Sequence, residues 1–262
     1  MRQSRITFEE CARRILQREL GRPVVLHDDG RGPGLYDLRV GDETAPDIAI
    51  ECVGAVDSAR VETWNIGPAL GPLALNVAGD WDVVLRPNAR VKEIKKRLEK
   101  ALQDCELAHI KGFTPVDWWL ERQNPRIYAV LEALRIDSIA CFRESGTGQV
   151  HLVMTSTGGA VDPYGSAVPG WIEEFLNSPD RRDVIRKLEL SGAVRRHVFV
   201  GVAFVGAPWP VESYLGTRTD HAPTGSPALP SCVDAVWIRY GRRGLHWDGS
   251  SWRIFDAFVP TA

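Results

Sequence analysis

Two acidic residues lie on neighbouring predicted strands, and their carboxylates have the chemistry to bind a metal ion. Asp37 lies in the segment GLYDLRV, and Glu51 lies in PDIAIECVGAVD. Hard cations such as Mg²⁺ take oxygen ligands, often from one or two carboxylates. An acid inside the apolar run around Glu51 is costly to bury unless it is paired or bound to a metal. We therefore expect the carboxylates of Asp37 and Glu51 to lie close enough to share one cation.

Structural roles for these acids stay open at this point. Asp37 could end a strand or pair with Arg39, and Glu51 could be a buried acid satisfied by a hydrogen bond. Asp47 is an alternative ligand because Pro46 and Asp47 precede Glu51, although a turn before the strand suits it better.

The elements that must position the acidic pair follow from apolar periodicity. Residues 7–20 have helical spacing, with Thr7 as the predicted N-cap and Gly21 just beyond the end. Four predicted strands and a clear amphipathic helix follow, at residues 23–29, 35–40, 47–56, 81–87 and 88–108. A weak helix or loop is expected before the fourth strand.

This order resembles the αβββαβ core of the PD-(D/E)XK nuclease-like superfamily, the restriction-endonuclease-like fold. That family has an Asp on its second strand and an acid, any residue and then Lys on its third. Asp37 and Glu51 match the two acids, and Val53 stands at the lysine position. The resemblance covers residues 7–106. It implies magnesium-dependent phosphodiester hydrolysis of nucleic acid, with Glu10 (or Glu9) of the first helix as a further carboxylate.

With Val53 at this position, the third strand lacks the lysine ammonium group that orients or activates the attacking water in this family. The resemblance extends to members in which the lysine has moved, so we expect Arg60 or a lysine of helix 88–108 to replace it. A second hypothesis keeps the fold without catalysis. The N-terminal half would then be a binding or scaffolding module that acts through a protein partner.

Two basic segments are candidates for contact with nucleic-acid phosphates. Residues 86–100 contain seven Lys and Arg against two acids, and residues 181–197 contain six against two. Together on one groove they would bind phosphates; as solvated helix faces they would not. The candidate nucleic-acid-binding residues are Arg90, Lys92, Lys95, Lys96, Arg182 and Arg186.

The C-terminal half is predicted as a mixed α/β region with helices near residues 115–136 and 171–192. Strands are expected at 137–144, 149–157, 195–206, 235–240 and in a hairpin over 244–255, with a long loop over 207–230. We place a boundary near residue 110, between a nuclease-like core at 1–110 and a second domain at 111–262. The C-terminal strands could equally extend the first sheet. The phrases VPGWIEEFL and RRHVFVGVAF resemble actinobacterial proteins of unassigned function, which implies no activity.

Composition is that of a globular α/β (α+β mixed-sheet) protein. The 262 residues are 44% hydrophobic and 25% charged, with a net charge of -2. The five cysteines form no C-x-x-C pair, so a structural zinc site or a disulfide framework is not expected. No signal-peptide pattern, membrane span or dinucleotide motif is present. We expect a cytoplasmic protein with Mg²⁺ as its cofactor, no organic cofactor and no membrane association.

Overall fold

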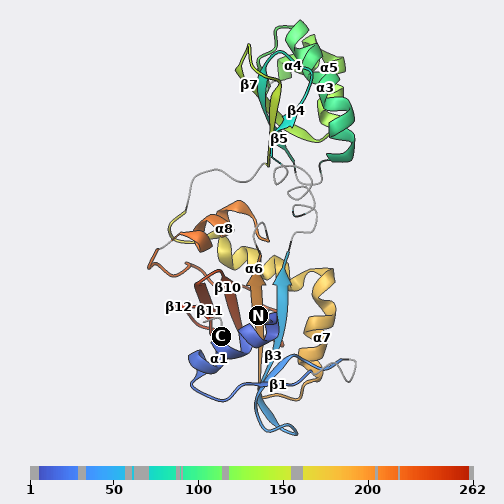
Figure 1. Cartoon of the computed structure of the whole chain (residues 1–262). Coiled ribbons are helices and arrows are strands. Elements are labelled where there is room, and N and C mark those ends of the chain that lie inside the picture. The colour runs from blue at the N-terminus through green and yellow to red at the C-terminus, as the bar shows by residue number, and fades with distance from the viewer. Residues whose placement is uncertain are drawn as a thin grey trace, which may run out of the picture. The chain divides into compact units, whose positions relative to one another are not determined.

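The chain forms two compact units, each with its own sheet and core. Unit 1 comprises Met1–Val56 and Gly159–Ala262, and unit 2 comprises Asp57–Gly158. Unit 2 is therefore an insertion in the sequence of unit 1 (Figure 1). The computed structural model describes residues 6–28, 34–56, 61, 71–86, 89, 91–113, 118–154, 162–203, 206–217 and 219–259.

Unit 1 contains a seven-stranded mixed sheet with the order β1-β2-β3-β9-β10-β11-β12. Its strands are β1 (Val25–Leu26), β2 (Leu38–Gly41), β3 (Pro46–Ala55), β9 (Arg195–Val202), β10 (Ala235–Tyr240), β11 (Arg243–Trp247) and β12 (Trp252–Asp256). The central strands β3, β9 and β10 run parallel, and the remaining neighbours pair antiparallel. A strand that is apolar on both faces, as β3 is, suits such a covered central position.

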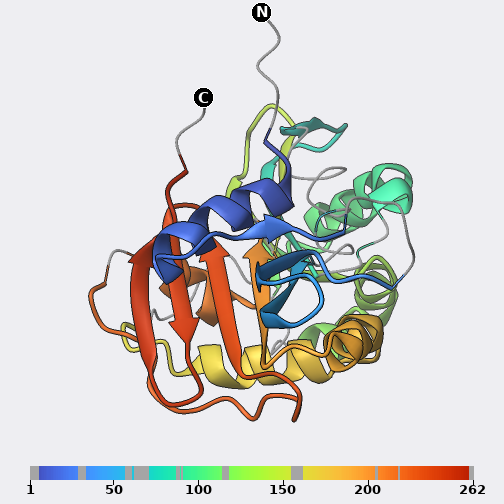
Figure 2. The same ribbon diagram turned by 90° about the horizontal axis from the view of Figure 1, so that it is seen from below.

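Helices cover both faces of this sheet, as Figure 2 shows. One face packs against α1 (Phe8–Leu20), through Ile48 and Ile50 of β3. The opposite face, which carries Ala49 and Val53, packs against the other helices. These are α6 (Ala167–Asn177), the 3-10 turn η2 (Pro179–Arg181), α7 (Arg182–Leu190) and α8 (Trp209–Gly216). Alternation along β3 thus divides its side chains between two hydrophobic cores.

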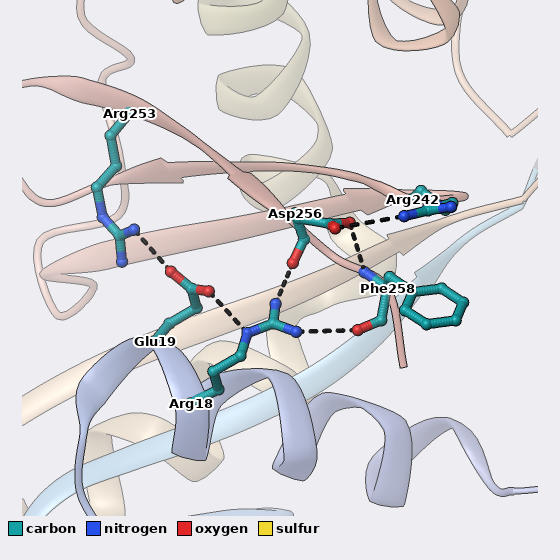
Figure 3. Close-up of polar contacts among 6 residues, drawn as sticks. All are labelled: Arg18, Glu19, Arg242, Arg253, Asp256 and Phe258. Carbon is teal, nitrogen blue, oxygen red and sulfur yellow. Dashed lines mark hydrogen bonds and ion pairs between the residues drawn. The ribbon is translucent and has the colours of Figure 1, made fainter. Parts of the chain in front are cut away.

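Helix α1 is capped as predicted and is tied to the C-terminal strand. Thr7 Oγ1 accepts a hydrogen bond from the backbone N–H of Glu10, and Gly21 ends the helix in the left-handed conformation. Glu19 accepts from Arg253 of β12 at 2.8 Å, while Arg18 donates to the backbone carbonyls of Asp256, the last residue of β12, and of Phe258 (Figure 3). These contacts fix α1 across its face of the sheet.

Unit 2 has a five-stranded mixed sheet with the order β4-β8-β5-β7-β6. Its strands are β4 (Leu73–Ala74), β5 (Asp80–Leu85), β6 (Gly112–Phe113), β7 (Ile136–Arg143) and β8 (Gln149–Met154). Its helices are α3 (Val91–Leu107), α4 (Trp118–Gln123) and α5 (Pro125–Ala133), whose apolar residues share one core with the sheet. Along the described residues of both units, no helix is long and apolar enough to cross a membrane.

The mixed α/β class is confirmed, but the division of the chain differs from the predicted boundary near residue 110. The expected fourth strand and the helix after it exist as β5 and α3, and both belong to unit 2. The parallel neighbour of β3, on the side away from β2, is β9. The C-terminal strands β9–β12 extend the first sheet, which is the alternative that the sequence left open.

The predicted loop over residues 207–230 is wrong in its first part, because α8 forms there. Pro208 precedes the helix and Pro210 lies in its first turn, where a backbone N–H has no helical partner to lose. Val211, Tyr214 and Leu215 then bury their side chains in the core of unit 1. The prolines start this helix rather than prevent it.

Two buried histidines flank Trp237 on the α1 face of the sheet. Trp237 Nε1 donates to His197 Nδ1 at 3.3 Å, and the Trp237 and His246 rings stack with centroids 3.6 Å apart. Arg253 Nε donates to His246 Nδ1 at 3.1 Å. Burial, with repulsion from Arg195, lowers the pKa of His197 to about 3. Burial, with repulsion from Arg253, lowers the pKa of His246 to about 4.

We predict that these histidines make the folded state sensitive to mild acid. The unfolded chain takes up protons below pH about 6.5, whereas the folded state keeps both rings neutral, so stability falls as pH falls from 6.5 towards 4. Each histidine contributes a slope of about 1.4 kcal/mol per pH unit in that range. Urea unfolding between pH about 6.5 and about 5 should show a reduced slope in His246→Phe. An unchanged slope in that variant, matching the exposed-site control His221→Phe, would contradict the prediction.

Candidate functional site

The fold brings Asp37 and Glu51 together at one edge of β3. The ladder pairs Leu38 with Ile50, which places Asp37 opposite Glu51. The backbone N–H of Asp37 donates to Glu51 Oε2 at 3.2 Å, and Asp37 Oδ2 accepts from the backbone N–H of Cys52 at 2.6 Å. Both acids alternate with residues of the α1 core and therefore belong to the opposite face of the sheet. The predicted pair is thus assembled in space.

The Glu51 carboxylate meets a lysine that comes from α7. The Glu51 side chain is only 3% exposed, and Lys187 Nζ lies 2.8 Å from Glu51 Oε1. The same ammonium lies 4.0 Å from Asp183, one turn earlier in α7. Asp37, Glu51 and Lys187 therefore form one cluster, which we call the acid–lysine site.

The electrostatics of the acid–lysine site favour an added positive charge. Burial and, to a lesser extent, the nearby Asp37 carboxylate raise the pKa of Glu51 well above its ordinary value, while the hydrogen bond with Lys187 opposes the shift. Burial would lower the pKa of Lys187, but its hydrogen bond to Glu51 and the charges of both acids raise it overall. A carboxyl group that is held back from ionising by burial and a neighbouring acid gains from a second cation.

Local packing explains why the cation comes from α7 and not from β3. Val53 is two residues beyond Glu51 on the same face, and it is buried in the core that includes Leu188 of α7. Lys187 adjoins Leu188 on the helix, so its stem runs beside this apolar layer and its ammonium reaches Glu51. Position 53, where the sequence resemblance predicted a lysine, is thus occupied by a packed core residue, while a helix on the same face supplies the charge.

Lys187 was missed by sequence reasoning, which expected Arg60 or a lysine of helix 88–108. Arg60 lies outside the described residues, and that helix is α3 of unit 2. The sequence gives only a weak signal that Lys187 lies near the core. Lys187 follows Val184 by three positions, which places it at the edge of the apolar face of α7.

The structure does not bring Glu10 to the acid–lysine site within the described chain. Glu10 accepts from Arg13 at 2.6 Å and from Arg14 at 2.7 Å, and these hydrogen bonds lower its pKa to about 2. It belongs to α1, which packs on the other face of the sheet. The alternative ligand Asp47 is half exposed and pairs with Arg22.

The predicted nucleic-acid-binding residues are divided between the two units. Arg182 and Arg186 are exposed on α7 in unit 1, and Lys96 is exposed on α3 in unit 2. Arg90 and the side chains of Lys92 and Lys95 lie outside what the structure describes. The two arginines therefore share a helix with Lys187.

The donor chemistry of the acid–lysine site fits Mg²⁺. Among the described residues, no group of three or more His, Cys, Asp or Glu is arranged to hold a metal ion. Mg²⁺ keeps several waters and is commonly held by one or two carboxylates together with substrate phosphates. Asp37 and Glu51 are the residues that would hold it.

No family model, curated protein or solved structure matches this chain.

We predict that Lys187 and Glu51 are energetically coupled. Lys187→Met should reduce the free energy of unfolding by about 1–3 kcal/mol, because a buried acid loses its partner. Adding Glu51→Gln should recover part of this loss, with a coupling of about 0.5–3 kcal/mol in a double-mutant cycle. The exposed control Lys96→Met should change stability by less than about 0.5 kcal/mol. Strict additivity of the two substitutions would show that the ion pair carries no net interaction.

Proposed function

We propose that this protein is a magnesium-dependent nuclease that hydrolyses phosphodiester bonds in nucleic acid. The observation that carries the proposal is the 2.8 Å contact between Lys187 Nζ and Glu51 Oε1, beside Asp37. Asp37, Glu51 and Lys187 together supply the two carboxylates and the ammonium that such a site needs, although β3 has Val53 at the usual lysine position. A cytoplasmic location belongs to the proposal and is supported by five free cysteines, which suit a reducing compartment.

The order of elements in unit 1 supports the same proposal. Helix α1 is followed by β1, β2 and β3, and then by α6, α7 and β9. This is the αβββαβ order of the PD-(D/E)XK core, with unit 2 inserted after the strand that carries Glu51. The resemblance therefore applies to unit 1 and not to the continuous segment 7–106. Helices cover both faces of the sheet, and the acidic pair lies where β2 begins beside β3.

Each residue of the acid–lysine site has a distinct role in the proposed reaction. A divalent cation held by Asp37 and Glu51 would stabilise charge on the phosphate and lower the pKa of a bound water. Asp37 is oriented by the Cys52 N–H, and Glu51 by the Asp37 N–H and by Lys187. Lys187, whose pKa is raised, holds its proton and orients the attacking water or offsets the negative charge that develops.

Cleavage assays with matched variants test the proposal. Wild-type protein should cut DNA or RNA in Mg²⁺ or Mn²⁺, and Asp37→Ala, Glu51→Ala and Lys187→Met should each lower kcat by about 100-fold or more, the scale of losing an electrostatic group that acts on the transition state. Gel or fluorescence assays with labelled substrates measure the rates.

Asp47→Ala is the control, because it removes an acid from the same strand but away from the pair. It should keep near wild-type activity, and so should Glu10→Gln. Equal residual cleavage in all variants would indicate contamination and would remove the nuclease proposal.

A second candidate function is a nuclease-like module that binds nucleic acid or a protein partner without cleavage. The observation that favours it is that the Lys187 ammonium, 2.8 Å from Glu51 Oε1, itself offsets the charge of that carboxylate. Exposed Arg182 and Arg186 would then give salt-dependent binding to phosphates. Salt-dependent binding by wild-type protein that cuts no substrate in either metal would support this alternative.

A further inference from the structure

Among the described residues, no strand pairs with β3 on its β2 side beyond the acid–lysine site, and we call this stretch of β3 the open edge. Pairing with β2 ends at Ile50, and the next amide on this edge, that of Cys52, is taken by the Asp37 side chain. The Ala55 carbonyl accepts from Ala203 on the β9 side, so the carbonyl of its neighbour Gly54 faces the open edge. Two residues along a strand span about 7 Å, so Gly54 lies about that far along β3 from Cys52, whose amide holds the Asp37 carboxylate.

Arg181 brings a guanidinium group to this open edge. Its Nη2 donates to the Gly54 carbonyl at 3.3 Å, and its Cζ lies 4.4 Å from the centroid of the Phe175 ring. Its Nε is buried and has no hydrogen-bond partner within the described chain. No carboxylate of the described residues forms an ion pair with it, in contrast to Lys187. The guanidinium is therefore positioned by a carbonyl and an aromatic ring, and no acid in the described part of the chain neutralises its charge.

We propose that Arg181 is a substrate-binding residue that holds a phosphate of the nucleic-acid backbone beside Asp37 and Glu51. The inference rests on the proposed function and adds a contact that the sequence did not single out. Guanidinium groups bind phosphate through two parallel N–H donors, which an ammonium cannot do. Arg181 is placed to fix the phosphodiester at the open edge of β3, next to the acids.

Binding in EDTA tests the role of Arg181 separately from cleavage. The probe is a fluorescein-labelled oligothymidylate of about twelve nucleotides, followed by anisotropy as KCl rises from about 50 to about 200 mM. Arg181→Gln should raise Kd and reduce the slope of log Kd against log salt by about 0.7, the value for one phosphate contact on a single strand. Arg181→Lys should keep the slope but bind more weakly than wild type, because it lacks the planar fork.

The control is Arg195→Gln, which removes the same charge from β9 of the same unit. Arg195 pairs with Ile48, six strand positions and about 20 Å from the level of Gly54, so it should keep the wild-type slope. Thermal melting checks folding, and if Arg181→Gln unfolds, weaker binding by Arg181→Lys decides. Equal Kd and slope for the Arg181 and Arg195 variants would overturn the inference, and so would a wild-type protein that does not bind.

The outcomes separate this inference from the proposed function. Loss of a phosphate contact in Arg181→Gln, with no cleavage by wild-type protein in Mg²⁺, would support the Arg181 site and refute hydrolysis. Cleavage by wild-type protein, with unchanged binding by Arg181→Gln, would refute the Arg181 site alone.

Discussion

A carboxylate in the middle of a buried strand needs a cation, and much of unit 1 is arranged around that requirement. Glu51 is almost fully enclosed, and ionising it there costs more than in water. Lys187 offsets this cost, because its Nζ lies 2.8 Å from Glu51 Oε1. Asp37 adds a second negative charge beside Glu51. Breaking such a pair on one side leaves an uncompensated buried group. In the proposed function, a divalent cation would offset the same imbalance of two acids against one lysine.

The fold supplies the pair and its cation from separate parts of the chain. The β2–β3 register sets Asp37 opposite Glu51, and the parallel pairing of β3 with β9 brings α7 onto the same face. On the other face, α1 is held by its N-cap and by its contacts with β12. Unit 2 enters the chain after β3 and leaves it before α6. The insertion therefore separates in sequence the strand that carries Glu51 from the helix that carries Lys187.

Sequence reasoning succeeded where the signal is local. Thr7 and Gly21 mark the ends of α1, and the apolar run around Glu51 marks a central strand. It failed where the relevant partner is distant in sequence. Within the insertion, β5 is followed by the amphipathic helix α3, and this pair resembles in sequence the strand and helix expected to complete the core. Lys187 was assigned to a basic surface because charge alone does not reveal that a long side chain turns inward past Leu188.

The most direct measurement is the location of bound Mn²⁺ by anomalous diffraction from crystals of the wild-type protein. The account predicts one anomalous peak in contact with the carboxylates of both Asp37 and Glu51, on the face of the sheet that α7 covers. It also predicts that crystals of Glu51→Gln lack this peak. Mn²⁺ bound elsewhere, or no peak between the two acids at concentrations that support cleavage, would contradict the central claim that these residues form a metal site.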